Sequence, residues 1–119
     1  MFKKRTSKYG VSKKEDRTYN GKVYDSKLEM RYRQHLDLLT KAVKDCDRVI
    51  LINEQVPYEC FVEGKKICTY MMDYEVEYAN GNIEFVDVKG VRTAIYRLKK
   101  KLVEAIYGIE IKEVTTKDF

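Results

Sequence analysis

The spacing of apolar side chains changes along the chain from a helical period to an alternating one and back again. Residues 26–44 carry apolar side chains at intervals of three and four, which predicts an amphipathic helix from Ser26 to Lys44. Its stripe comprises Leu28, Tyr32, Leu36, Leu39 and Val43. The same spacing predicts a second helix after Gly90 that ends at Gly108, a residue type suited to a helix end. The second stripe comprises Ile95, Leu98, Leu102 and Ile106.

Three runs rich in β-branched and aromatic residues lie between the helices. They read "VILINEQVPYECFV", "KICTYMMDYEVEYA" and "IEFVDVKG", and the turn signals "EGKK" and "NGN" separate them. We therefore expect an antiparallel meander, with Pro57 on an edge strand or at a bulge because proline lacks the amide donor of a ladder. The last run, "IEIKEV", should return to the same sheet beside its predecessor. The predicted class is α/β, a mixed sheet flanked by helices.

Length and charge narrow the organisation and the partners. A chain of 119 residues suffices for one core, and 24 Lys and Arg against 19 Asp and Glu give a formal charge of +5, which favours a polyanionic partner such as nucleic acid over a membrane. Residues 1–20 are basic and poor in aliphatic side chains, which predicts a flexible arm before a single domain over 21–119. With no apolar run long enough to span a bilayer, we expect a cytoplasmic protein.

Four charged side chains converge if the turn between the second and third strands has the right length. A three-residue loop at 80–82 would pair Asp73 with Lys89 and Glu75 with Asp87, so that all four share one face. A two-residue turn would place Asp73 and Asp87 on opposite faces. We expect the three-residue loop, or an equivalent bulge, because it also brings the apolar faces of the strands together.

Clustered carboxylates repel one another unless a proton or a cation lies between them. Carboxylate oxygens favour Mg²⁺ or Mn²⁺ over zinc, and a lone His35 with three cysteines lacking C-x-x-C spacing leaves no histidine pair or zinc-thiolate set. A lysine beside such a metal can stabilise charge on a phosphate. Metal-assisted phosphodiester hydrolysis would use all these groups, whereas the alternative is an exposed cross-strand salt bridge.

These residues carry a resemblance to a known superfamily. Asp73, a hairpin, then "DVKG", with Glu29 on the preceding helix and a basic helix afterwards, resemble the PD-(D/E)XK nucleases. More narrowly, "YDSKLE", "DVKG" and "RLKKKL" look like small phage-encoded Holliday junction resolvases of that superfamily. The similarity covers about residues 20–114 and implies a restriction-endonuclease-like sheet. Met72 precedes Asp73 where the name of the motif has proline.

The resemblance implies a role for each matching residue. Asp73 and Asp87 would bind Mg²⁺ or Mn²⁺, the Val88 carbonyl would add a ligand, and Lys89 would be the catalytic lysine. Glu29 would be an outer acidic residue that reaches the metal directly or through water. The alternative for Glu29 is a capping box, in which Ser26 caps the helix and Glu29 bonds back to its amide.

Basic side chains outside this cluster, and the backbone amides near Thr93, are candidates for DNA contacts, and their alternative is a solvated surface. They comprise Thr93, Arg97, Lys100 and Lys101 around the second helix, and Lys13 and Lys14 in the arm. Tyr96 is a candidate for stacking on an unpaired base.

The expected activity is that of a Mg²⁺-dependent endodeoxyribonuclease selective for branched DNA, a Holliday junction resolvase. Two symmetric cuts in one junction require two active sites, so the resemblance also implies a homodimer. If the chain is phage-encoded, it would act in the host cytoplasm. Two alternatives stay open: a less structure-selective endonuclease subunit of a DNA-processing complex, and a nucleic-acid-binding module without catalysis.

Overall fold

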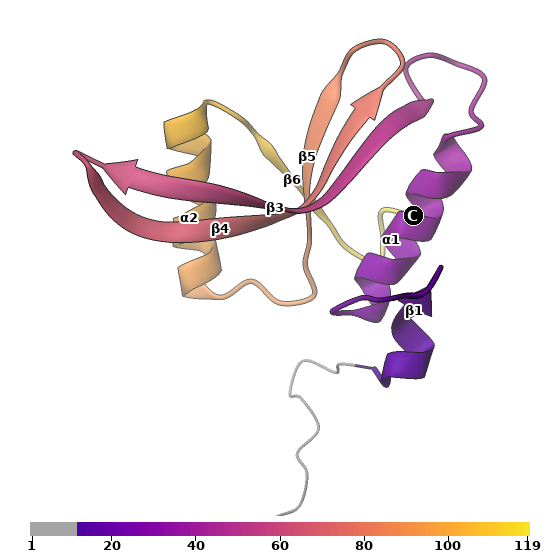
Figure 1. Ribbon diagram of the computed structural model, residues 1–119, viewed down its shortest axis with the longest axis horizontal. Helices are drawn as coiled ribbons and strands as arrows, with labels where there is room; N and C mark the ends of the chain where they lie inside the picture. Colours follow the sequence, from indigo (N-terminus) through magenta and orange to yellow (C-terminus); the bar gives the residue numbers. More distant parts are fainter. Residues whose placement is uncertain (1–11) are drawn as a thin grey trace, which may run out of the picture.

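A computed structural model describes residues 12–119 and has the expected α/β class (Figure 1). The elements in chain order are η1 (Lys14–Arg17), β1 (Thr18–Tyr19), β2 (Lys22–Val23), α1 (Lys27–Leu39), β3 (Val49–Val62), β4 (Lys65–Tyr78), β5 (Ile83–Val88), α2 (Ala94–Tyr107) and β6 (Ile111–Val114). No helix among the described residues is long and apolar enough to cross a membrane.

The main sheet is mixed and has four strands in the order β3-β4-β5-β6. The first three strands form an antiparallel meander, and β6 returns through α2 to lie parallel to β5. Both features were expected, and they are compatible with a restriction-endonuclease-like sheet. Pro57 lies on the edge strand β3, where a missing amide donor costs least. The strands β1 and β2 form a separate antiparallel pair.

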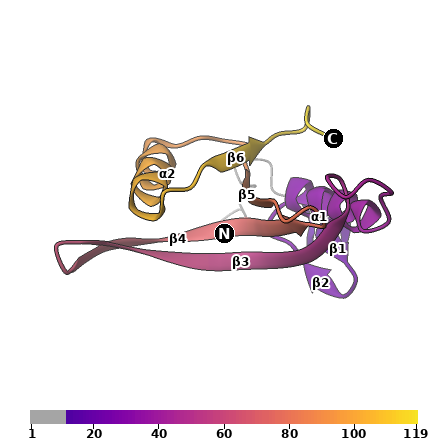
Figure 2. The same cartoon turned by 90° about the horizontal axis from the view of Figure 1, so that it is seen from above.

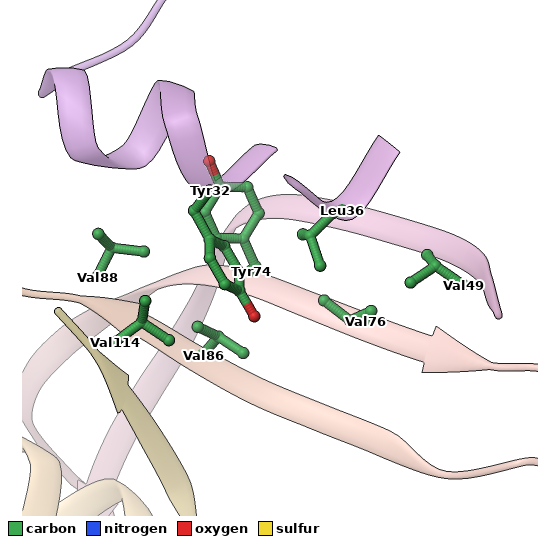
Figure 3. Close-up of a cluster of buried hydrophobic side chains, with 8 residues drawn as sticks. All are labelled: Tyr32, Leu36, Val49, Tyr74, Val76, Val86, Val88 and Val114. Carbon is green, nitrogen blue, oxygen red and sulfur yellow. The ribbon is translucent and has the colours of Figure 1, made fainter. Parts of the chain in front are cut away.

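Each helix buries one cluster of apolar side chains against the sheet. The α1 cluster comprises Tyr32, Leu36, Val49, Tyr74, Val76, Val86, Val88 and Val114 (Figure 3). The α2 cluster comprises Cys60, Tyr70, Met72, Tyr96, Val103 and Ile111. Val86 packs in the first cluster and Phe85 packs against the second, so the two helices cover opposite faces of β5.

The strand β4 changes the helix that it packs against at Asp73. Regular alternation would put Tyr70, Met72, Tyr74 and Val76 on one face of β4, but the first two pack with α2 and the last two with α1. The register puts Gln55 of β3 across from Asp73, and Gln55 has a φ of 52°. A left-handed residue interrupts the pleat, and the strand pair turns at this point. Figure 2 shows the β3–β4 ribbon beside α2, with α1 at its other end.

The helix α1 ends at Leu39, five residues before the predicted end at Lys44. Thr40 caps it, and the chain then turns, leaving Val43 91% exposed rather than on the buried stripe. The Arg48 guanidinium donates to the carbonyl oxygens of Ala42 and Val43, at 3.5 and 3.2 Å. These bonds stabilise the turn in place of further helical hydrogen bonds.

Of the predicted apolar stripe of the second helix, Leu102 packs against the α2 cluster and the other three residues do not. Ile95 and Leu98 are each 67% exposed, and Ile106 is also exposed. The buried residues are Tyr96 and Val103. The ring of Tyr96 supplies a large apolar surface to the sheet and its hydroxyl finds a partner on β6, so this face outcompetes the aliphatic stripe.

Part of the predicted arm is ordered. Residues 1–11 lie outside the described residues, but η1 and β1 occupy most of the rest, so the boundary predicted at residue 20 is too late. The Arg17 guanidinium donates to the carbonyl oxygens of Ser12 and Tyr24, and the Tyr19 hydroxyl donates to Asp37 of α1 at 2.7 Å. Such bonds hold a segment that is too poor in apolar side chains to form a core.

Candidate functional site

The pairing of β4 with β5 places Tyr78 opposite Asn82, so the turn has three residues, as expected, but it lies one residue earlier, at 79–81. The Tyr78 amide donates to the Asn82 carbonyl at 2.8 Å, and Tyr74 pairs with Val86. The predicted pairs of Asp73 with Lys89 and of Glu75 with Asp87 are therefore wrong by two residues. A shift of two keeps every side chain on its face, so the continued register places Asp73 opposite Asp87.

Asp73 is buried and fully hydrogen-bonded. Its exposed fraction is 8%. Its Oδ1 accepts a hydrogen bond from Gln55 Nε2 at 3.1 Å, and its Oδ2 accepts one from the Val88 amide at 2.8 Å. Burial, together with the neighbouring Asp87 and Glu29 carboxylates, raises the pKa of Asp73 to about 8.

Asp87 is the most buried charged side chain of the described residues, with an exposed fraction of 1%. Its Oδ2 accepts a hydrogen bond from the Tyr70 hydroxyl, whereas its buried Oδ1 has no hydrogen-bond partner among the described residues. The Lys89 ammonium lies 3.3 Å from this Oδ1, an ionic contact without hydrogen-bond geometry. The alternative for these residues was an exposed salt bridge, but Asp87 is buried and only the Lys89 side chain is partly exposed.

Glu29 is buried in the first turn of α1. Ser26 caps the helix by accepting a hydrogen bond from the Glu29 amide at 3.0 Å, but the described residues show no return bond from the Ser26 amide to the Glu29 carboxylate. The Tyr74 hydroxyl donates to the Glu29 carbonyl at 2.7 Å and so ties this turn to β4. The capping box is therefore only half formed, which leaves the Glu29 carboxylate available for another role.

The Glu29 carboxylate interacts electrostatically with Asp87 and Lys89. Burial raises the pKa of Glu29 to about 7, the carboxylates of Asp25 and Asp87 act in the same direction, and the Lys89 ammonium opposes them. The structure places Asp73, Asp87 and Lys89 together, three of the four residues that the strand pairing predicted, and Glu29, which the resemblance added, is near enough for Asp87 and Lys89 to affect its pKa. Glu75 lies outside this group: it pairs with Phe85 and accepts a hydrogen bond from Tyr58.

The donor atoms suit a hard divalent cation. Three carboxylates gather in one buried region, and Asp87 Oδ1 is a buried oxygen without a hydrogen bond, which is the kind of atom that a cation would satisfy. Within residues 12–119, no three His, Cys, Asp or Glu side chains already form a metal-binding arrangement. Val88 contributes its amide, as a donor to Asp73, and the ligand role of its carbonyl stays a prediction.

The predicted DNA-contacting residues differ in their availability. Arg97 and Lys101 are exposed on α2, whereas Lys100 pairs with Glu104 at 3.3 Å. Thr93 is the N-cap of α2, and its hydroxyl accepts a hydrogen bond from the Tyr96 amide at 3.1 Å. In the segment before η1 and at its start, Lys13 and Lys14 are both exposed.

Three residues at the site had no assigned role in the sequence analysis, or the wrong one. Strand alternation placed Tyr70 on the face away from Asp87, and the turn of β4 at Asp73 brings it back. Gln55 carried no signal, because its left-handed backbone is not visible in the sequence. Tyr96 was a candidate for base stacking, but its ring is buried, with the Lys89 ammonium 4.5 Å from the ring centroid.

Comparisons with known proteins give a family but no relative of described activity. No curated protein and no solved structure matches the chain. A family model described as "Protein of unknown function (DUF1064)" matches residues 6–117, which is nearly the whole chain. The chain therefore belongs to this family of proteins of unknown function, DUF1064.

Proposed function

We propose that this protein is a metal-dependent DNA endonuclease that cuts four-way junctions. The observation that carries the proposal is the buried pair of Asp73 and Asp87 on adjacent strands, with the Lys89 ammonium 3.3 Å from Asp87. Burying two carboxylates side by side costs stability, and proteins accept that cost mainly where the charges have a chemical use. The resemblance to PD-(D/E)XK nucleases assigns that use to the same three residues.

Asp73, Asp87 and Glu29 would hold the metal, with the Val88 carbonyl as a further ligand. A bound Mg²⁺ or Mn²⁺ would supply Lewis acidity to the phosphate and lower the pKa of the attacking water. The Lys89 ammonium group lies beside Asp87, where it would donate to a phosphate oxygen as negative charge develops. Gln55 and Tyr70 each hold one carboxylate in place through a hydrogen bond.

The substrate class rests on charge and on the resemblance. A net charge of +5 favours DNA, and Arg97 and Lys101 are exposed on the helix that follows the strand of Asp87 and Lys89. Two symmetric cuts in a four-way junction require two sites, so the active form would be a homodimer. The reaction would take place in the cytoplasm, which is the host cytoplasm if the chain is phage-encoded.

The test is cleavage of a labelled four-way DNA junction and of a linear duplex of the same arm sequence. Each is incubated with the protein in Mg²⁺, in Mn²⁺ and in EDTA. We expect paired cuts in the junction that depend on the metal and that Asp87→Asn and Lys89→Met abolish. Lys41→Met, which removes the same charge from an exposed residue beyond the C-terminal end of α1, should cleave like the wild type.

Each other outcome selects an alternative. Equal cutting of junction and duplex would replace the resolvase with a less selective endonuclease, such as a subunit of a DNA-processing complex. Junction binding without any cutting in either metal would contradict the nuclease and favour the binding module. In that case Asp87→Asn should bind as tightly as the wild type.

A further inference from the structure

We propose that Tyr96 is the positioning residue for Lys89, and that the face of its ring keeps the ammonium group beside Asp87. The inference deepens the proposed function and rests on it for its catalytic consequence. The juxtaposition itself is a property of the fold: β5 and its continuation bring Lys89, and the first turn of α2 brings Tyr96.

Among residues 12–119, two groups lie close enough to the ammonium group of Lys89 to hold it. One is Asp87 Oδ1, at 3.3 Å, and the other is the Tyr96 ring, whose centroid lies 4.5 Å away. This distance is within the range of about 6 Å over which a cation is attracted to the face of an aromatic ring. Because the ion pair has no hydrogen-bond geometry, the carboxylate alone does not fix the direction of the side chain.

Tyr96 is itself held from three sides. Its hydroxyl donates to Glu113 Oε2 on β6 at 2.7 Å, and Glu113 Oε1 accepts from Arg92 Nε at 2.9 Å. Its amide donates to the Thr93 cap at 3.1 Å, and the ring is 8% exposed. Because the backbone, ring and hydroxyl of Tyr96 are all held, its ring can restrict the motion of the Lys89 side chain, whereas a mobile ring could not.

Such restriction matters for a lysine in particular. Its four-carbon stem is flexible, and its ammonium group is a point charge without the planar fork of arginine. A lysine that must meet a developing negative charge gains from being held near that position before the reaction. The alternative is that Tyr96 serves only as part of the α2 cluster, in which case the orientation of Lys89 would not depend on its ring.

The first measurement needs only the metal-free wild-type protein and does not depend on activity. In a sample labelled with ¹³C-lysine, the NMR signals of the Lys89 ε-methylene group, assigned with Lys89→Arg, should be shifted upfield by the ring of Tyr96 and should show restricted motion. Tyr96→Leu should return both properties to those of an exposed lysine, while Tyr96→Phe, which loses the bond to Glu113 but keeps the aromatic face, the Thr93 cap and the packing, should retain most of both. Tyr107→Leu, the same change on the last turn of α2, is the control.

The second measurement links this contact to catalysis. On the junction substrate, Tyr96→Leu should lower kcat at least tenfold with a KM within about threefold of wild type, and Tyr96→Phe should stay within about threefold in both. An unshifted, mobile Lys89 in the wild type would overturn the proposal even if Tyr96→Leu failed to fold. Equal kcat in wild type and Tyr96→Leu would overturn the catalytic role. A wild type that cuts no DNA would refute the nuclease, and the NMR result would still decide the contact.

Discussion

At the scale of single residues, the site is a balance between buried carboxylates and the donors around them. Asp73 has a donor for each oxygen, whereas Asp87 has Tyr70 at one oxygen and only an ionic neighbour at the other. Leaving a buried carboxylate without any hydrogen bond lowers the stability of the fold by more than forming that bond raises it. The hydrogen bond from Tyr70 should therefore stabilise the fold, and the free energy of unfolding can test this without any activity.

Tyr70→Phe removes one hydroxyl and leaves the packing of the ring intact. We expect the free energy of unfolding near pH 7 to fall by about 1–3 kcal/mol, because Asp87 is then buried without a hydrogen bond. Urea unfolding followed by circular dichroism measures this. Tyr107→Phe, which loses a hydroxyl bond to an exposed carbonyl of β3, is the matched control and should lose less than about 1 kcal/mol. Equal losses would mean that Tyr70 has no special relation to Asp87.

The raised pKa of Asp73 predicts how stability depends on pH without metal. Its pKa of about 8 in the folded protein lies above the value of about 3.9 for an unfolded aspartate, so the folded state binds the proton more tightly. This contribution is complete below the unfolded value and is lost as the pH rises through about 8, with a slope of at most about 1.4 kcal/mol per pH unit.

The measurement is the free energy of unfolding in EDTA between pH 5.5 and 8.5. The wild type should lose stability across this window relative to Asp73→Asn, which has no proton to release. Glu29, with a pKa of about 7, adds to the same trend, so the double variant with Glu29→Gln should flatten the curve further. Parallel curves for wild type and Asp73→Asn would contradict the raised pKa.

At the scale of elements, a second charged cluster fixes α1 and the β1–β2 pair to the edge of the sheet. Glu54 of β3 accepts from Lys22 Nζ at 2.7 Å and from the Tyr24 hydroxyl at 2.9 Å, and Arg33 of α1 lies 2.9 Å from its Oε2. Burial alone would raise the pKa of Glu54, but these three donors lower it below its usual value. This cluster orients the helix that carries Glu29.

Glu54→Gln should lower the free energy of unfolding by about 1 kcal/mol at pH 7, since it weakens three charge-assisted contacts. A lowered pKa contributes stability above the unfolded value of about 4.3 and loses it as the pH falls through the folded value. The difference from wild type should therefore shrink below about pH 4. Glu59→Gln, whose pair with Lys66 is largely exposed, should cost less than about 0.5 kcal/mol at any pH. A larger cost for Glu59→Gln would contradict this assignment.

At the scale of the whole molecule, α2 presents aliphatic side chains that residues 12–119 leave exposed. Ile95 and Leu98 are each 67% exposed on the helix that follows the site, and Ile106 lies along the same face. Apolar side chains at helical spacing that stay exposed among the described residues are typical of a surface that contacts another protein surface. The homodimer that junction cutting requires would provide such a surface.

The dimer can be tested by replacing an exposed leucine with lysine on each of the two helices in turn. The wild type should sediment as a dimer at micromolar concentration, and Leu98→Lys should make it a monomer with little change in unfolding, because the side chain is already exposed. Leu38→Lys on α1, at a leucine that is 75% exposed, should leave the dimer intact. A monomeric wild type would refute the dimer, and disruption by Leu38→Lys alone would place it on α1.

Local patterns in the sequence were enough to predict most of the helices and strands and to name candidate residues for the site. Alternation and turn residues predicted the meander, and glycine at 108 predicted the end of α2, where its φ is 65°. Asp73, Asp87 and Lys89 were named before the fold was known, because charged residues on predicted strands stand out against their neighbours, whereas Glu29 was named only through the resemblance. Alternate residues of a strand share a face, so a shift of two residues in the pairing leaves Asp73, Asp87 and Lys89 on the same face.

The tertiary structure alone decided what those residues touch. Local spacing cannot show that Gln55 adopts a left-handed backbone and turns β4, and that turn brings Tyr70 to Asp87. Nor can it choose between two apolar faces of α2, because both satisfy helical periodicity and only packing against β4 and β6 selects Tyr96 over Ile95. Periodicity is a property of neighbours in the chain, whereas burial, pKa and the position of Lys89 depend on residues brought together from distant parts of it.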